Sequence, residues 1–230
     1  MQSFISRRAV LTSLGGISAV AVLAGCSDSD AQGSSSGAAA AEAPAAEGTV
    51  DVAKLMEVPE GSLPDLAYGK DDAPVTVVEY ASLTCSHCAA FHRDTWPTVK
   101  EKYVDSGKVR FIIREFPFDP LATAGFMVAR CSESNRNALV DTLFDKQADW
   151  VVSQGASEKL LGIARLAGIS QEKFNACLTD QALAGQVQAV QQRGQSEFGV
   201  NATPTFFING NKYSGALSVD QMSAIIDSML

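Results

Sequence analysis

Apolar and polar positions follow two different periods along the chain, and the change between them marks a first strand and a first helix. Residues 75–80 are rich in β-branched side chains, which predicts a strand. After residue 89 the apolar side chains recur at helical spacing, so we expect a helix to about residue 104, kinked or interrupted at Pro97. Residues 109–116 are mostly apolar and predict a second strand, buried within a sheet.

The segment from about residue 119 to residue 198 changes to helical periodicity throughout. Five stretches place apolar residues at helical spacing: 121–130, 136–150, 157–167, 170–178 and 183–198. Ser157 and Ser170 are candidate N-caps, and Gly168 is a candidate C′ glycine. An all-helical block is therefore expected to be inserted between strands.

The end of the chain returns to strand patterning and closes with a helix. Residues 205–208 and 212–213 flank Asn209-Gly210, a dipeptide typical of a tight hairpin turn. An amphipathic helix follows over about residues 218–229. Strand, helix, strand, helical insert, hairpin and helix together predict one α/β domain over residues 49–230.

The first 25 residues contain two arginines, no acid and a weakly apolar stretch, which is typical of a targeting segment. Residues 6–11 resemble a twin-arginine export signal, and Leu23-Ala24-Gly25-Cys26 resembles a bacterial lipoprotein box in which Cys26 is lipidated. The alternative is an uncleaved membrane anchor. Either interpretation places the rest of the chain outside the cytoplasm, and we expect it on the periplasmic side of the cell envelope, anchored by lipid.

Residues 26–48 are expected to form a flexible linker after the lipidated cysteine. They are dominated by alanine, serine and glycine, contain no basic residue, and lack the apolar side chains needed to build a core. Without the two arginines of the leader, 16 basic residues remain against 26 acidic ones. No basic patch interleaved with aromatic residues is present, so nucleic acid is not an expected partner.

The five cysteines fall into three groups. If Cys26 carries a lipid, the two at positions 131 and 177 lie in predicted helices and form either a structural disulfide, which an exported protein permits, or two buried thiols. Cys85 and Cys88 stand three residues apart where the predicted strand gives way to the helix. A helix N-terminus favours a thiolate, which makes Cys85 the candidate nucleophile and the more enclosed Cys88 its resolving partner.

These features together resemble the DsbA-like thioredoxin-fold family of exported thiol:disulfide oxidoreductases. Cys85-Ser86-His87-Cys88 is similar to the family's Cys-Pro-His-Cys, and Glu79 matches a buried acid six residues before the first cysteine. Thr203-Pro204 matches the loop that faces the disulfide through a cis-proline. The resemblance implies a thioredoxin-like fold with an inserted all-helical domain.

The resemblance also implies roles for the residues around the two cysteines. His87 would add positive charge and hydrogen-bond donors beside Cys85, whereas Ser86 replaces the family's proline and leaves the direction of electron flow open. Glu79 would accept the proton of Cys88, the alternative being an exposed acid at a strand end. His92 stands where the family often has an acid, and we expect it to be a solvated helix residue.

The loop residues and the inserted helices carry further expectations. Thr203 and Pro204 would present a backbone edge to a substrate segment. The helical block would be either a stabilising cap or a lid whose apolar face, including Phe116, Phe118 and Trp150, binds unfolded chains.

We therefore expect a monomeric, cofactor-free oxidase that donates the Cys85–Cys88 disulfide to exported proteins with cysteine pairs and is reoxidised by a membrane partner. The alternatives within enzymes are a reductase or an isomerase, and no separate dimerisation module for an isomerase is visible before residue 75. A different class is a holdase or a lipoprotein that binds Cu(I) through the two cysteines and His87. Neither a holdase nor Cu(I) binding requires the Thr203-Pro204 loop, whereas disulfide exchange does, and we assign no metal site.

Overall fold

The computed structural model describes residues 43–230 of the chain. The expected export signal, the lipidation of Cys26 and most of the linker lie outside the described residues. No helix within residues 43–230 is long and apolar enough to cross a membrane.

One mixed sheet of six strands forms the centre of the domain, in the order β1-β6-β5-β3-β4-β2. The strands are β1 (Gly48–Thr49), β2 (Leu66–Tyr68), β3 (Val75–Ala81), β4 (Val109–Glu115), β5 (Thr205–Ile208) and β6 (Asn211–Ser214). Strands β3 and β4 run parallel, and all other neighbours are antiparallel. Strands β3 and β4 are covered on both faces, and the burial predicted for residues 109–116 is confirmed.

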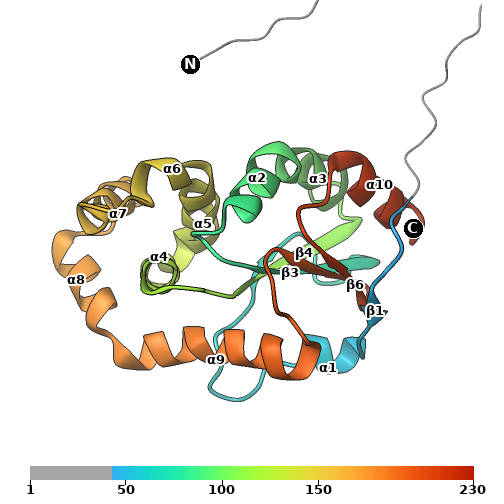
Figure 1. Ribbon diagram of the computed structural model, residues 1–230, viewed down its shortest axis with the longest axis horizontal. Coiled ribbons are helices and arrows are strands. Elements are labelled where there is room, and N and C mark those ends of the chain that lie inside the picture. The colour runs from blue at the N-terminus through green and yellow to red at the C-terminus, as the bar shows by residue number, and fades with distance from the viewer. Residues whose placement is uncertain (1–42) are drawn as a thin grey trace, which may run out of the picture. The chain divides into compact units, whose positions relative to one another are not determined.

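Helices cover both faces of the sheet (Figure 1). One face carries α2 (Ser86–Asp94), α3 (Trp96–Val99), the π-helical turn η1 (Lys100–Val104) and α10 (Val219–Asp227). The opposite face carries α1 (Val52–Met56) and α9 (Gln181–Phe198). The predicted interruption at Pro97 is confirmed, because α2 ends at Asp94 and the proline lies in the first turn of α3.

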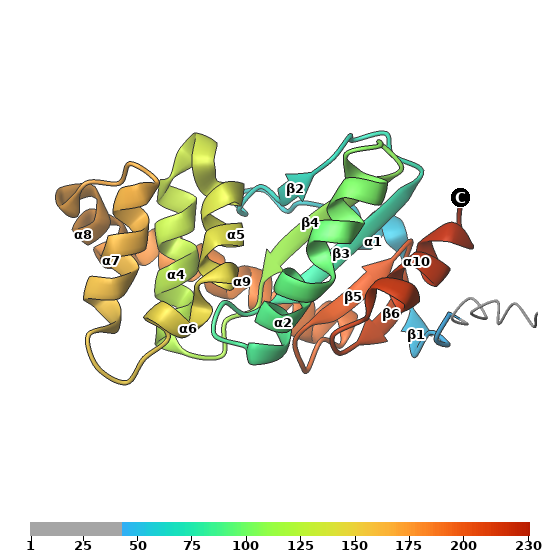
Figure 2. The same ribbon diagram turned by 90° about the horizontal axis from the view of Figure 1, so that it is seen from above.

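The inserted helices gather beside the sheet, and α9 returns along it (Figure 2). They are α4 (Pro120–Cys131), the 3₁₀ turn η2 (Glu133–Asn135), α5 (Arg136–Asp145), α6 (Gln147–Trp150), α7 (Ala156–Leu166) and α8 (Gln171–Thr179). A disulfide joins Cys131 of α4 to Cys177 of α8 across 46 positions of sequence. The structure therefore has the thioredoxin-like fold with an inserted helical domain that the sequence predicts.

The helix ends agree with two of the three predicted caps. The Ser170 side chain accepts a hydrogen bond from the backbone of Lys173 and caps α8, and Gly168 adopts a φ of 82° directly after α7. The expected cap at Ser157 is wrong, because α7 begins one residue earlier and its N-cap is Gly155, with a φ of 69°. Glycine adopts this left-handed conformation without the steric cost that serine would meet.

The hairpin is confirmed, whereas the short elements before residue 75 were not predicted. Asn209 and Gly210 have φ values of 45° and 84°, as a tight turn with two left-handed residues requires. Contacts of the domain extend before its predicted boundary at residue 49, because the backbone N–H of Glu47 donates to the Lys212 carbonyl at 2.9 Å. Elements β1, α1 and β2 are two to five residues long, too short to show a period.

Candidate functional site

The two cysteines lie where β3 passes into α2. Cys85 is the N-cap residue of α2 and has an extended backbone, and its side chain makes no capping hydrogen bond as a thiol. Its amide donates to the Ser82 carbonyl at 3.1 Å, which closes the turn after the strand. Cys85 is partly exposed and Cys88 is fully buried, and both are free thiols.

The Thr203-Pro204 loop faces Cys85 from the start of β5. The antiparallel pairing of β5 with β3 brings residues separated by 118 positions together, and the Cys85 thiol donates to the Thr203 carbonyl with a sulfur–oxygen distance of 3.3 Å. The peptide bond before Pro204 is cis. The Thr203 hydroxyl is buried and makes no hydrogen bond within residues 43–230 while Cys85 is a thiol that donates to the Thr203 carbonyl.

The surroundings of the two sulfurs move their pKa values in opposite directions. A hydrogen bond from the Cys88 thiol is the main reason that the pKa of Cys85 falls from 9.0 to about 5. The Thr203 side chain and the backbone N–H groups of Cys88 and His87 lower this pKa further, against the opposing effect of burial. Burial, the hydrogen bond to Cys85 and the nearby charge of Glu79 all raise the pKa of Cys88. The surroundings therefore favour a thiolate at the partly exposed Cys85 and a thiol at the enclosed Cys88.

Ser86 and His87 occupy the first turn of α2 with exposed side chains. The contribution of His87 to the Cys85 thiolate is made by its backbone N–H, and its imidazole is not among the groups that shift the Cys85 pKa. Any residue with a free amide would supply the same donor. The predicted electrostatic role of the His87 ring therefore remains a prediction.

Glu79 and His92 form a buried pair behind the cysteines. Glu79 is completely buried, and its Oε2 lies 2.9 Å from Nε2 of His92. His92 is itself buried, with 6% of its surface exposed. The alternative of an exposed Glu79 is therefore wrong, and so is the expectation that His92 is solvated. His92 follows Cys88 by four residues, which places both on the same face of α2. That spacing is the sequence signal that identifies His92 as buried.

The inserted helices hold the turn that carries Cys85. The Gln147 side chain at the start of α6 donates to the carbonyls of Leu83 and Cys85 at 2.8 and 3.0 Å. Asp119, the N-cap of α4, accepts a hydrogen bond of 2.6 Å from the Thr84 hydroxyl. No pattern in the sequence indicates either contact, because both depend on how the insert packs against the sheet.

The predicted apolar lid is only partly present. Trp150 is fully buried and donates to the Leu143 carbonyl at 2.9 Å, and Phe116 is buried, so neither offers a binding surface. Phe118 is 53% exposed. It lines an open groove of about 420 Å³ between the β4–α4 connection and α9, together with Met127 and Gln188.

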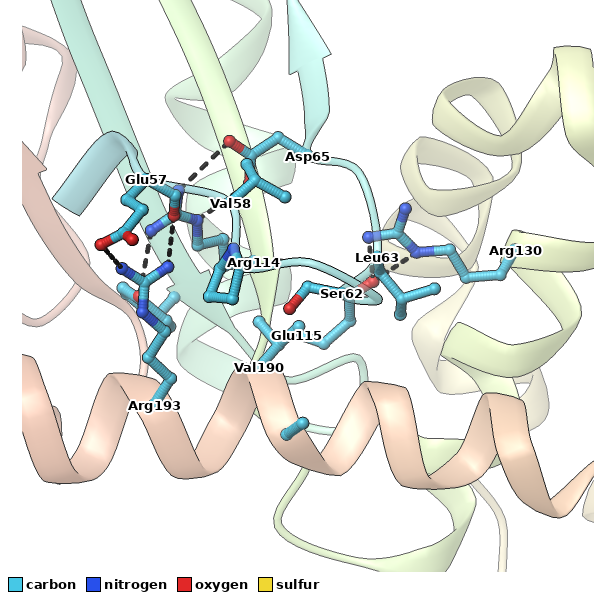
Figure 3. A pocket seen from close by; sticks show the side chains of 13 residues that line it. Glu57, Val58, Ser62, Leu63, Asp65, Arg114, Glu115, Arg130, Val190 and Arg193 are labelled. Atoms are coloured by element: carbon cyan, nitrogen blue, oxygen red, sulfur yellow. Dashed lines mark hydrogen bonds and ion pairs between the residues drawn. The ribbon is translucent and has the colours of Figure 1, made fainter. Parts of the chain in front are cut away.

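A second, more enclosed cavity lies on the sheet face away from α2 (Figure 3). Its arginines are already paired: Arg114 with Asp65 at 2.9 Å, Arg130 with Glu115, and Arg193 with backbone carbonyls of the α1 region. The cavity holds about 40 Å³, which is room for a few water molecules. We interpret it as a structural ion-pair cluster that fastens α9 and the segment before β2 to the sheet.

The site offers thiol chemistry and shows no converging set of metal ligands. Within residues 43–230, no three histidine, cysteine or acidic side chains are grouped so that they could hold a metal ion. His87 is exposed on the helix surface while Cys88 is buried beneath it. The three donors considered for Cu(I) therefore do not form a common site.

Comparison with known proteins agrees with this geometry. The thioredoxin family profile matches residues 62–228. A relative from Rickettsia bellii, provisionally named a protein-disulfide oxidoreductase, is 31% identical over 168 residues, covering 72% of this chain and 64% of its own length. The corresponding Rickettsia conorii protein is 32% identical, with 72% and 60% covered. The chain thus spans less than two thirds of the length of these relatives.

The chain is also similar to solved structures of known proteins. Wolbachia pipientis alpha-DsbA1 superposes with a TM-score of 0.70 at 30% identity, covering 77% of this chain and 94% of that protein. Oxidised BdbD from Bacillus subtilis has a TM-score of 0.65 at 23% identity, with 82% and 98% covered, and supports the fold alone.

Proposed function

The chain belongs to the thioredoxin family, and from this membership and the geometry of its two cysteines we propose that it is a DsbA-like thiol:disulfide oxidoreductase. The observation that carries the proposal is the contrast between the two sulfurs. Cys85 is a partly exposed thiol at a helix N-terminus with a pKa of about 5, and Cys88 is an enclosed thiol with a raised pKa. A dithiol in which one sulfur attacks and leaves easily while the other is shielded is suited to disulfide exchange.

The reaction proceeds through two exchanges of sulfur partners. A substrate thiolate attacks Cys85 in the disulfide form, producing a mixed disulfide and leaving Cys88 to be protonated. The second thiolate of the substrate then attacks the substrate sulfur that is bonded to Cys85 and expels Cys85 as a thiolate. The substrate gains a disulfide, and the enzyme is left with Cys85 and Cys88 reduced.

The low pKa of Cys85 favours the oxidising direction. A thiolate that is stable at neutral pH is a good leaving group and stabilises the reduced enzyme, which makes the disulfide form a stronger oxidant. We therefore propose that the physiological substrates are exported proteins with cysteine pairs. A membrane redox partner would restore the disulfide.

The neighbouring residues have supporting roles in this proposal. Thr203 and cis-Pro204 would present a backbone edge beside Cys85 on which an extended substrate segment pairs as a strand does. Glu79 would exchange a proton with Cys88, since its charge already acts on that thiol. The sequence of residues 1–26 supports a location on the periplasmic side of the cell envelope, with a lipid on Cys26.

Oxidation of a reduced peptide that contains two cysteines tests the proposal. We expect the oxidised protein to convert the peptide to its disulfide and Cys85→Ala to abolish the reaction. Cys88→Ser should instead form a mixed disulfide through Cys85 when it is given the peptide in its disulfide form, because the Cys85 thiolate opens that disulfide and no Cys88 thiol resolves the product. Cys26→Ser is the matched control, because it removes a cysteine outside the redox pair. The proposal fails if Cys85→Ala oxidises the peptide as well as the unchanged protein does.

The reduction potential of the Cys85–Cys88 pair decides between oxidase and reductase. Equilibration with glutathione measures it directly. A potential near that of thioredoxin, about −270 mV, would assign the protein as a reductase instead. Ser86 is the reason for including this test, because the freer turn it allows weighs against strong oxidation.

A further inference from the structure

The turn that carries the nucleophile lies outside both the sheet and the helix that flank it. Strand β3 ends at Ala81 and α2 begins at Ser86. The Cys85 carbonyl accepts the first hydrogen bond of α2, from the Ala89 N–H at 3.1 Å. Leu83 is completely buried, and its carbonyl belongs to neither the strand ladder nor the helix. A buried carbonyl is costly to leave unpaired, so this turn needs a donor from another part of the fold.

Gln147 of the inserted domain is that donor. Its Nε2 donates to the Leu83 carbonyl at 2.8 Å and to the Cys85 carbonyl at 3.0 Å. A glutamine amide carries two N–H groups, so this one side chain uses both of them on the active-site turn. The two carbonyls lie on either side of Thr84. The bonds therefore fix the peptide groups at both ends of the Thr84-Cys85 segment.

Close packing holds Gln147 in place. Gln147 is the first residue of α6, and Trp150 in the same helix is fully buried, with its indole N–H bonded to the Leu143 carbonyl at 2.9 Å. Gly125 of α4 contacts both the helix and the turn: a Cβ at this position would lie 3.0 Å from the Trp150 ring and 2.9 Å from the Leu83 side chain. Contacts this close leave α6 little freedom relative to the turn. The Gln147 amide thus acts from a rigid support.

Gln147 bonds to the backbone of Cys85 and not to its sulfur. The pKa of Cys85 is lowered by Cys88, by Thr203 and by backbone N–H groups of α2, against the opposing effect of burial. An uncharged amide that reaches only carbonyl oxygens adds little to this balance. Removing it should change where the Cys85 sulfur lies and leave its charge nearly unaltered.

We propose that Gln147 is a positioning residue for ring closure, the step in which Cys88 attacks the Cys85 sulfur of a mixed disulfide. This inference rests on the proposed function, because it concerns one step of disulfide exchange. When Cys85 attacks an external disulfide, the incoming molecule can turn to meet the sulfur. In ring closure the chain holds both sulfurs, Cys88 within α2 and Cys85 in the turn. Their alignment therefore depends on the backbone that Gln147 fixes, and a misplacement of about 1 Å can cost about 100-fold in rate.

The step balances without a further reactant. In the mixed disulfide Cys85–S–S–R, Cys88 loses its proton to solvent and its thiolate attacks the Cys85 sulfur. A Cys85–Cys88 bond forms, the bond between Cys85 and the R sulfur breaks, and RS⁻ leaves with the electron pair. The two cysteines are oxidised to a disulfide, and the external disulfide is reduced to two thiolates over the two steps.

A small aromatic disulfide, Ellman's reagent, separates ring closure from the first attack. The probe is mixed with the reduced full chain in a Cys26→Ser background, and the coloured thiolate is followed by stopped flow. The first phase reports attack by Cys85, and its rate increases with reagent concentration. The second phase reports ring closure, and its rate is independent of that concentration. Two coloured thiolates per protein show that only the Cys85–Cys88 pair reacts.

Gln147→Met removes both donors while nearly keeping the length of the side chain. We expect the second phase to slow by about 10- to 100-fold, with the first phase and the Cys85 titration unchanged. Gln147→Asn keeps a polar amide but is one methylene shorter, so it should slow the second phase in the same sense. Gln186→Met is the matched control, because Gln186 also donates to a backbone carbonyl at 2.8 Å, that of Gly61. It should leave both phases unchanged.

The pH dependence distinguishes positioning from proton transfer. A misplaced sulfur lowers the second-phase rate by the same factor at every pH, so the profiles of Gln147→Met and the unchanged protein should run parallel. A profile of different shape would overturn the proposal, because it would mean that Gln147 acts on the Cys88 proton. A purely structural loss of stability would not slow one phase alone.

An unchanged second phase in both Gln147→Met and Gln147→Asn would overturn the proposal. Equal slowing of the two phases, or equal slowing of the second phase by Gln186→Met, would also overturn it. If near-ultraviolet circular dichroism shows that Gln147→Met does not fold, Gln147→Asn alone decides. Failure of the proposed function would appear separately, as the absence of exchange with the cysteine peptide, since the reagent assay needs only the thiol pair.

Discussion

The Cys88 thiol is the largest single cause of the low pKa of Cys85, so Cys88→Ala should raise that pKa more than any other single change in the site. Thr203→Val removes the next side chain that stabilises the thiolate and should raise the pKa by a smaller amount. Valine has nearly the shape of threonine, so the change tests the hydroxyl with little effect on packing. The pKa of Cys85 should therefore be lowest in the unchanged protein, higher in Thr203→Val and highest in Cys88→Ala.

The size of the effect follows from the two limiting pKa values. With a pKa of about 5, about 99% of Cys85 is thiolate at pH 7, whereas a thiol with the ordinary value of 9.0 is about 1% thiolate. Intrinsic nucleophilicity falls as the pKa falls, with a Brønsted coefficient of about 0.4–0.5, and this offsets most of the roughly 100-fold gain in thiolate. Attack by Cys85 at pH 7 therefore changes little, and the main benefit is faster departure of Cys85 from a mixed disulfide.

Ultraviolet absorbance of the thiolate, followed as a function of pH in a Cys26→Ser background, measures these pKa values. The pH dependence of alkylation by iodoacetamide gives an independent value, and Cys88→Ala removes any ambiguity over which sulfur titrates. A midpoint near 9 in the unchanged protein would refute the electrostatic reasoning. An identical midpoint in the unchanged protein and in Cys88→Ala would refute the assignment of Cys88 as the main cause.

The same pKa gives the reduced protein a pH-dependent stability. The folded-state pKa of Cys85 is depressed below its unfolded value, so its contribution is fully present above about pH 9 and is lost as pH falls towards about 5. The oxidised form has no such thiol. We expect the melting temperature of the reduced protein to fall relative to that of the oxidised protein across this window, and a constant difference between them would contradict the prediction.

Two further predictions concern the scaffold. Gly194→Ala should lower the free energy of unfolding by about 1–3 kcal/mol, because the added Cβ would lie 2.6 Å from the Tyr80 ring. Gly185→Ala on the same helix adds a Cβ that meets nothing within 4 Å, so it should raise the free energy of unfolding by up to about 1 kcal/mol. Denaturant unfolding of both variants measures these changes. Replacing Cys131 and Cys177 by alanine should lower unfolding free energy by about 2–5 kcal/mol while leaving the Cys85 titration unchanged, and a shifted titration would contradict the purely structural role.

The elements that the sequence predicted are those with a long periodic pattern or a distinctive turn. Strands β3 and β4, the helices of the insert and the Asn209-Gly210 hairpin belong to this group, because burial on one or both faces imposes a period that survives in the residue order. Strands β1 and β2 do not, since two or three residues cannot display alternation. Their positions are set by pairing with β6 and β4, which is tertiary information.

The same distinction holds for the site. Cys85, Cys88 and the Thr203-Pro204 loop could be predicted because they form short motifs at the ends of recognisable elements. The burial of His92 was missed although the signal was present, because its distance of four residues from Cys88 places it on the inner face of α2.

The contacts of the insert bear on whether it is a cap or a part of the active site. A cap that only buried apolar surface would leave the turn before α2 to its own backbone. Instead Gln147 holds the carbonyls of Leu83 and Cys85, and Asp119 holds Thr84, so two helices of the insert fix the backbone that carries the nucleophile. Since disulfide exchange requires the attacking sulfur to be aligned with the sulfur pair, loosening either brace should slow exchange even where the Cys85 pKa is unchanged. In the proposed exchange reaction the inserted helices would therefore position the nucleophile, although the cysteines lie outside them.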